Sequence, residues 1–191
     1  MSTLAEYPSN LTWDEFLALP HELRNASLID GEVLVDAPNE LHEFVVQNLI
    51  VVFREWMRAG HDRGQVSTQQ PVKINDRRGY QPDFSWYPQE RCAPAGQPKS
   101  YRGQLPALVV EVLSRSTRKR DLVRKRRDYE RIGIEEVWFV EQERDNGPLL
   151  ACQRKAPGEP FIDVAVDIDE MLTSPLLEGF EVRLGLLYED F

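Results

Sequence analysis

The sequence predicts a mixed α/β fold in which strands and helices surround one long apolar strand. Residues 107–113 (ALVVEVL) form a continuous apolar run, which is typical of a strand buried on both faces. Apolar residues recur at helical spacing over residues 40–59, and a second helix is predicted over residues 117–132, ended by Gly133. The order of elements around this second helix predicts a sheet that combines parallel and antiparallel pairs.

Short local signals predict the remaining elements. Thr12 and Glu15 form a capping box that opens a short helix to about residue 19. Asp30 and Gly31 stand between two short apolar runs over residues 28–35, which predicts a hairpin because both turn positions need positive φ. Further strands are expected at residues 66–74, 80–86, 135–140, 149–153, 161–166 and 180–184, with a long loop at residues 88–106.

Length and composition restrict the class of protein. The 191 residues are expected to form one domain over 1–191, large enough to need no disulfide or structural metal. No apolar run reaches 18 residues, so no membrane span is expected, and the N-terminus does not resemble a secretory signal. Cys92 and Cys152 form neither a disulfide framework nor a metal-binding pair, which indicates a cytoplasmic location.

The charge of the chain is unevenly distributed. The total of −9 and the pI near 4.9 argue against a nonspecific nucleic-acid coat. Residues 115–131 nevertheless hold nine basic and three acidic residues, so this stretch carries +6 and the remainder −15. Two interpretations stay open: a solvated helix face, or a surface that contacts the phosphates of a nucleic acid, DNA being the expected partner.

Glu111 is the most informative residue because it lies within the most apolar strand of the chain. Burying an ionised carboxylate without a partner costs several kcal/mol. A position at a sheet edge would remove the difficulty. Otherwise, Glu111 must be protonated, paired with a cation or bound to a metal.

Asp83 and Lys125 are the candidate partners of Glu111. Asp83 follows Pro82 in an aromatic segment, where the proline indicates an interruption of the strand. On the basic helix, one stripe contains Leu122, Lys125, Tyr129 and Ile132. The apolar members of that stripe must face the sheet, so Lys125 points inward with them, although a lysine that only covers apolar surface with its stem is the alternative.

These residue types suit metal-assisted phosphodiester hydrolysis. Two carboxylates, Asp83 and Glu111, and one backbone carbonyl, that of Val112, are oxygen ligands that Mg²⁺ or Mn²⁺ accepts together with several waters. Lys125 would orient the attacking water or stabilise charge on the phosphorus. Asp83, Glu111 and Lys125 are therefore the predicted catalytic residues.

The histidines and tryptophans suggest no other chemistry. His21, His42 and His61 are dispersed and show no zinc-ligand spacing. His42 opens an amphipathic helix, where a capping or surface role is expected, with a place beside the site as the alternative. The four tryptophans lie in elements predicted to be buried and are expected in the core: Trp13, Trp56, Trp86 and Trp138.

Several segments together match the pattern of a known family over residues 11–191. They are, in order, LTWDEFLALP, LIDGEV, the helix with His42, QPDFSW, LVVEVLSRST, D-x3-K-x3-Y (Asp121, Lys125, Tyr129), IGIEEVWFVE and LTSPLLEGFEV. The ordered set resembles the Uma family of putative restriction endonucleases, within the PD-(D/E)XK nuclease superfamily. The resemblance implies a restriction-endonuclease-like fold, in which helices flank a mixed central β-sheet, and also a divalent metal and a homodimer. It further implies Asp83 and Glu111 as metal ligands and a lysine supplied by the following helix, Lys125.

Two positions depart from the family pattern. Ser27 stands where family members commonly have a glutamate that assists at the site, and Glu141 stands where they have an aspartate. Three hypotheses follow: a Mg²⁺- or Mn²⁺-dependent nuclease acting on DNA, a catalytically weakened or inactive nucleic-acid-binding module, or a protein-interaction domain.

Overall fold

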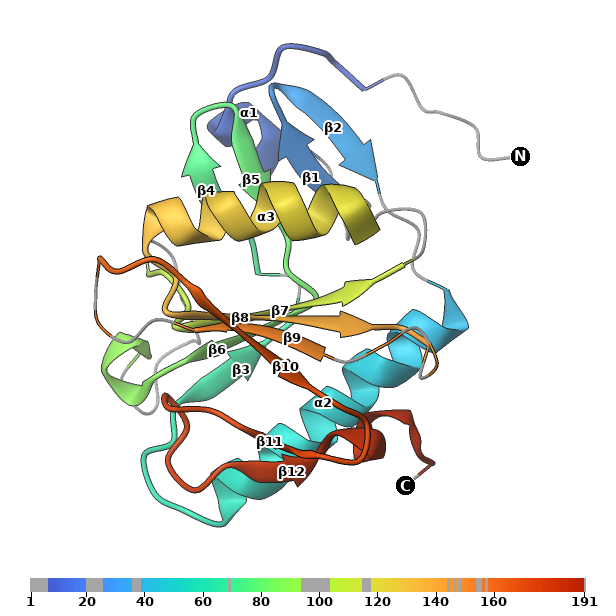
Figure 1. Ribbon diagram of the computed structural model, residues 1–191. Helices are drawn as coiled ribbons and strands as arrows, with labels where there is room; N and C mark the ends of the chain where they lie inside the picture. The colour runs from blue at the N-terminus through green and yellow to red at the C-terminus, as the bar shows by residue number, and fades with distance from the viewer. Residues whose placement is uncertain are drawn as a thin grey trace.

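Two β-sheets and two long helices form the main body of the protein, as a computed structural model shows (Figure 1). The structure describes residues 7–19, 26–35, 39–68, 70–93, 104–114, 118–143, 145, 147, 149–153, 156 and 158–190. Within these residues, no helix is long and apolar enough to span a membrane. The predicted mixed α/β class is confirmed.

The larger sheet has six strands, and β7 (Leu108–Leu113), the predicted apolar strand, lies inside it. β7 runs parallel to β8 (Glu136–Glu141), whereas every other neighbouring pair is antiparallel, so the predicted mixture of directions is confirmed. The spatial order is β10 (Ile162–Val166), β9 (Leu149–Gln153), β8, β7, β6 (Phe84–Tyr87) and β3 (Gln65–Ser67).

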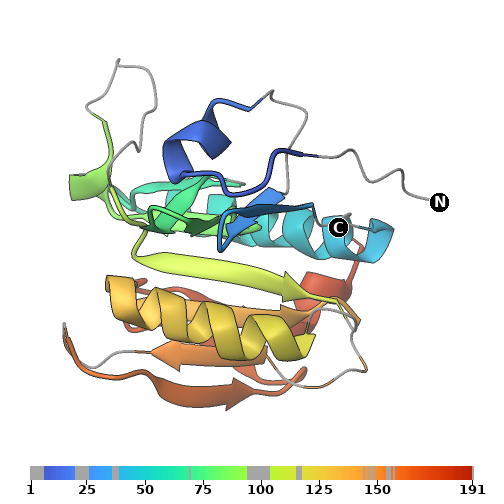
Figure 2. The same cartoon turned by 90° about the horizontal axis from the view of Figure 1, so that it is seen from above.

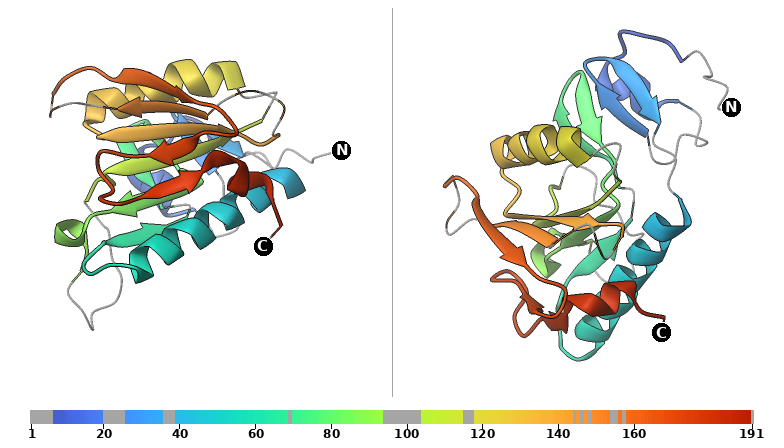
Figure 3. Two further views of the ribbon diagram at one scale, coloured as in Figure 1. Left: turned by 60° about the horizontal axis from the view of Figure 1, so that its bottom comes forward. Right: turned by 45° about the vertical axis from the view of Figure 1, so that its right-hand side comes forward.

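One long helix covers each face of this sheet (Figures 2 and 3). α3 (Arg118–Ile132) joins β7 to β8 and packs on the face that carries Val109 and Leu113. α2 (Glu40–Arg58) packs on the opposite face together with the C-terminal elements. Those elements are β11 (Met171–Thr173), β12 (Glu181–Arg183) and the 3-10 helix η3 (Leu184–Tyr188).

The smaller sheet lies beside α3 and contains the predicted hairpin (Figure 1). Its spatial order is β2 (Glu32–Val35), β1 (Ala26–Ile29), β5 (Arg78–Tyr80) and β4 (Val72–Asn75). Asp30 and Gly31 have φ of 54° and 89°, as the hairpin turn requires. The short helix α1 (Trp13–Leu17) packs against this sheet and begins with the predicted capping box of Thr12 and Glu15.

The prediction of single strands over residues 66–74 and 80–86 is wrong. Each range divides into two strands that belong to different sheets, β3 and β4 in the first range and β5 and β6 in the second. Pro71 and Pro82 lie between the two strands of each pair, and a proline cannot donate a hydrogen bond to a ladder. The chain therefore passes from the larger sheet to the smaller one and back before it reaches Asp83. Residues 94–103 of the loop predicted at 88–106 lie outside the described residues, and the described part of the loop contains one turn of 3-10 helix, η1 (Gln89–Arg91).

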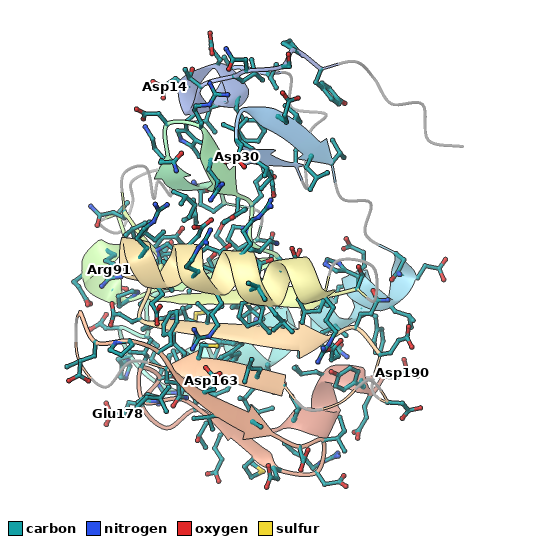
Figure 4. The ribbon with its side chains drawn as sticks, turned by 45° about the horizontal axis from the view of Figure 1, so that its top comes forward. Asp14, Asp30, Arg91, Asp163, Glu178 and Asp190 are labelled. Carbon is teal, nitrogen blue, oxygen red and sulfur yellow. The ribbon has the colours of Figure 1, made fainter. Side chains whose placement is uncertain are left out.

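The smaller sheet is fastened to α3 by one buried carboxylate. Asp128, on α3, accepts a hydrogen bond of 2.6 Å from the Tyr80 hydroxyl and one of 3.1 Å from Arg78. Arg78 also pairs with Asp30 on the hairpin (Figure 4). Since Asp128 is almost fully buried, these contacts tie the orientation of the smaller sheet to α3.

A second buried carboxylate has a structural role that the sequence did not reveal. Glu136, on β8, accepts hydrogen bonds from Trp138 at 2.6 Å, Gln153 at 2.9 Å and Ser174 at 2.5 Å. Burial raises the pKa of Glu136, and these three neutral donors oppose the rise. The contact with Ser174 joins the C-terminal segment to the larger sheet.

Aromatic side chains fill the core between α2 and the larger sheet. Phe53 lies at its centre, with ring centroids 4.6 Å from Phe84, 4.9 Å from Phe180 and 5.8 Å from Trp138. All four tryptophans are buried, as the sequence predicts. This core holds α2 against the sheet and thereby fixes where the first turn of α2 lies.

Replacing Phe53 by alanine should therefore lower the free energy of unfolding by about 3–5 kcal/mol, because the buried ring leaves a cavity. Urea unfolding followed by circular dichroism measures the change. Val123→Ala is the control, since Val123 is 67% exposed on α3 and should change stability by no more than about 0.5 kcal/mol. Equal effects of the two substitutions would contradict this assignment of the core.

Candidate active site

Glu111 lies in the interior of the larger sheet and not at its edge. It is on β7, between β6 and β8, and is 2% exposed. Val109 and Leu113, two residues before and after it, pack in the core cluster that includes Tyr129 of α3. Because side chains alternate along a strand, Glu111 points to the same side, toward α3.

Two donors on α3 meet the two carboxylate oxygens of Glu111. The Lys125 Nζ lies 2.8 Å from Oε2, and the Tyr129 hydroxyl donates to Oε1 at 2.5 Å. Lys125 is 9% exposed, and its ammonium also lies 5.6 Å from the centre of the Tyr80 ring. Lys125 and Tyr129 are four residues apart, so they lie on one side of the helix, as the stripe predicts. The alternative of a lysine that only covers apolar surface is therefore wrong.

Asp83 lies at the point where the chain enters β6 from the smaller sheet. Its Oδ2 accepts a hydrogen bond of 2.7 Å from the backbone N–H of Val112, which adjoins Glu111 on β7. In a strand, the N–H and C=O of one residue point to the same side. The Val112 carbonyl therefore faces Asp83, and the structure brings together Asp83, Glu111, Lys125 and this carbonyl.

His42 also belongs to this group of side chains, so the expected surface or capping role is wrong. Its Nε2 lies 3.0 Å from Oδ1 of Asp83, while the side chain of Asn39 caps α2 by accepting the backbone N–H of His42. Histidine spacing could not reveal this contact, because His42 and Asp83 approach only through the packing of α2 on the sheet. The place of His42 within the family pattern was the one available signal.

The electrostatics of the site follow from burial and from these contacts. Burial raises the pKa of Glu111 to about 7; Lys125 opposes the rise, and the charge of Asp83 adds to it. Burial alone would lower the pKa of Lys125, but Glu111, Asp121 and Asp83 hold that pKa above its ordinary value. Burial likewise opposes protonation of His42, but its contact with Asp83 produces a net rise in the pKa of His42.

A small pocket opens beside Asp83 and His42. Its volume is about 140 Å³, and the residues that line it are His42, Glu43, Val46, Gln47, Ile50, Thr68 and Asp83. A pocket of this volume admits water. It reaches Asp83 but is not lined by Glu111, Val112 or Lys125, so it adjoins one of the two acids.

The ligand set fits a hard, hydrated cation and not a metal enclosed by side chains. Among the residues that the structure describes, no group of three or more His, Cys, Asp or Glu side chains could hold a metal ion. Mg²⁺ is bound through one or two carboxylates and keeps several waters. Asp83, Glu111 and the Val112 carbonyl provide such a set.

The basic helix uses much of its charge within the molecule. Arg118 pairs with Glu141 at 2.5 Å, and Arg126 with Asp163 at 2.8 Å (Asp163 is labelled in Figure 4). Arg131 lies 3.7 Å from Asp128, and Lys125 is held by Glu111. Residues 115–117 of the basic stretch lie outside the described residues. The side chains of Arg118 and Arg131 are still 52% and 55% exposed in these pairs, so both interpretations of the charge run, a solvated face and a phosphate-binding surface, remain predictions.

Ser27, the residue at the family's glutamate position, is buried on β1 and faces the site region. Its neighbours Ala26 and Leu28 pack in the cluster under α1, whereas Ile29 packs in the cluster with α3. Side chains alternate along a strand, so Ser27 lies on the side of Ile29. A hydroxyl therefore occupies the place where the family pattern has a carboxylate. Glu32, across the hairpin turn, is exposed.

This mixed sheet between two helices is the restriction-endonuclease-like fold that the sequence predicts. It matches the crystal structure of a putative nuclease belonging to DUF820 from Anabaena variabilis, with a TM-score of 0.74 and 16% identity. The match covers 93% of this chain and 97% of the other. The chain belongs to the Uma2 family of putative restriction endonucleases, which matches residues 13–185. No curated protein matches it significantly.

Substitution of Lys125 by methionine should reveal the buried ion pair. Loss of one partner of a buried pair costs up to about 3–5 kcal/mol, and the larger loss is expected at pH 8, where Glu111 of the wild type is ionised and stabilised by Lys125. The pKa of Glu111 is about 7 in the wild type and is higher still in the variant, which lacks the cation. A smaller loss is therefore expected at pH 6, where Glu111 of the variant is protonated and uncharged. Stability relative to wild type therefore falls as pH rises, and urea unfolding at both values measures it.

The double variant Glu111→Gln, Lys125→Met is the control. It removes both charges, so its stability relative to wild type should vary less between pH 6 and pH 8 than that of Lys125→Met. If Lys125→Met were destabilised equally at both pH values, the result would contradict the assigned ion pair.

Proposed function

We propose that this protein is a Mg²⁺- or Mn²⁺-dependent endonuclease that hydrolyses phosphodiester bonds in DNA. In this proposal Asp83, Glu111 and the carbonyl of Val112 hold the metal, and Lys125 acts on the substrate. One observation carries it: in a chain of a nuclease family, the buried contact between Lys125 and Glu111 lies directly beside Asp83.

The residues of the site divide the chemistry among them. A bound divalent metal would polarise the phosphoryl oxygen and lower the pKa of a water bound to it. Lys125 and Tyr129 both donate to Glu111 and so favour its ionised form, against the effect of burial on its pKa. Lys125, whose pKa is held above its ordinary value, stays charged and can stabilise the negative charge that develops on the phosphate.

A binding module without catalytic activity is the second candidate function, and Ser27 is the observation that favours it. By the family resemblance, the hydroxyl of Ser27 stands in place of a carboxylate on the buried side of β1, so the site has one carboxylate fewer beside Asp83 and Glu111. A module of this kind would bind DNA in a salt-sensitive manner, and it would not cleave DNA in the presence of any metal. The predicted homodimer and cytoplasmic location remain predictions.

Metal binding is the first test of the proposal. Calorimetric titration of Mn²⁺ into the wild type should show one site, and Asp83→Asn and Glu111→Gln should each weaken binding by more than about tenfold, since each removes an anionic ligand. Glu181→Gln, an exposed position on β12, is the matched control and should bind as the wild type does. Unchanged affinity in both site variants would reject the metal assignment.

DNA cleavage is the second test. With Mg²⁺ or Mn²⁺, the wild type should cleave DNA, and Asp83→Asn should abolish cleavage because it removes a metal ligand. Gel analysis of a plasmid substrate measures the loss. Intact cleavage by Asp83→Asn rejects the assignment, whereas wild-type binding without cleavage in either metal selects the inactive module.

Arg124 tests the contribution of α3 to DNA binding. It forms no ion pair with the residues that the structure describes, whereas Arg126 is paired with Asp163. Arg124→Ala should weaken DNA binding and reduce the slope of log affinity against log salt by about one, and Arg126→Ala should have the smaller effect. Fluorescence anisotropy at several salt concentrations measures both. Equal slopes in the wild type and in Arg124→Ala would exclude Arg124 from the interface.

A further inference from the structure

Asp83 lies where the backbone gives it little support. It belongs to no strand, because β5 ends at Tyr80 and β6 begins at Phe84. Pro82 precedes it and cannot donate a backbone hydrogen bond. The orientation of the Asp83 carboxylate must therefore be fixed by groups from other elements.

Two elements fix it, one at each oxygen. The Val112 N–H, on β7, donates to Oδ2 at 2.7 Å, and the His42 Nε2, on α2, lies 3.0 Å from Oδ1. An ionised carboxylate only accepts hydrogen bonds, so the Nε2 of His42 carries the proton in this contact. The cap at Asn39 and the packing of α2 hold His42 in place, and its side chain is 14% exposed.

We propose that His42 is a positioning residue for the metal site, which holds Asp83 in the orientation that binds the cation. The inference rests on the proposed function because it assigns His42 a role toward a metal ligand. Groups that orient a ligand in this way strengthen metal binding because they order the ligand before the metal arrives.

The geometry argues against two other roles for His42. A general base needs a ring nitrogen that can reach water or substrate, and a metal ligand needs a free nitrogen lone pair. Nε2 is occupied by Asp83, while Nδ1 is buried, has no hydrogen-bond partner and lies 3.9 Å from the nearest Glu43 oxygen. Nε2 is therefore engaged by Asp83, and burial keeps Nδ1 away from solvent.

Three substitutions of His42 test the proposal through Mn²⁺ affinity, measured by calorimetry. The amide nitrogen of glutamine can reach the position of Nε2, whereas that of asparagine reaches only the position of Nδ1. His42→Gln should therefore bind Mn²⁺ within about threefold of wild type, and His42→Asn and His42→Ala should bind it about 10–100-fold more weakly. Leu41→Ala, on the exposed side of the same helical turn, should bind as the wild type does.

Wild-type affinity in both His42→Asn and His42→Ala overturns the proposal. A second measurement separates it from the proposed function, namely the melting temperatures of the metal-free variants. His42→Asn should melt below His42→Gln, and this difference should vanish in an Asp83→Ala background because the acceptor is gone. If the wild type binds no Mn²⁺, the proposed function fails. A difference in melting temperature that persists in the Asp83→Ala background overturns the positioning role.

Discussion

The ion pair between Glu111 and Lys125 is the constraint on which the rest of the structure depends. A carboxylate within the larger sheet is tolerated because an ammonium lies 2.8 Å away and a tyrosine hydroxyl occupies its other oxygen. Rotating α3 by one residue, about 100°, would carry Lys125 away and leave Glu111 alone among apolar neighbours. The charge pair thus fixes the rotation of the helix over the sheet, and packing alone would fix it less strictly.

The same helix connects the two sheets. The side of α3 toward the smaller sheet offers Asp128 to Tyr80 and Arg78, and the side toward the larger sheet offers Lys125 and Tyr129 to Glu111. Part of the basic stretch thus serves within the molecule: Lys125 is a buried counter-ion, and Arg118 and Arg126 pair with acids of the larger sheet. In the proposed function, a net charge of −9 would repel DNA, and a bound divalent cation would reduce this repulsion.

Much of the fold could be predicted from local patterns, because helix periodicity, caps and the Asp30-Gly31 turn act over a few residues. Glu111 was identifiable because a charge within an apolar run needs a partner, and Lys125 because its stripe must face the sheet. The division of residues 66–74 and 80–86 between two sheets was not predictable, since strand pairing is a long-range property. His42 was missed for the same reason: nothing near it in the sequence indicates Asp83.

The crossing of the chain between the sheets has a consequence for cooperativity. Asp83 is connected to the smaller sheet by only two residues after Tyr80, whereas Glu111 is embedded in the larger sheet. A local opening that detaches the smaller sheet from α3 would strain this short connection, while the contacts of Asp83 with Val112 and His42 would resist the displacement. Integrity of the site is thus linked to the docking of the smaller sheet as well as to global stability, so ligands that bridge both acids would also hold the two sheets together.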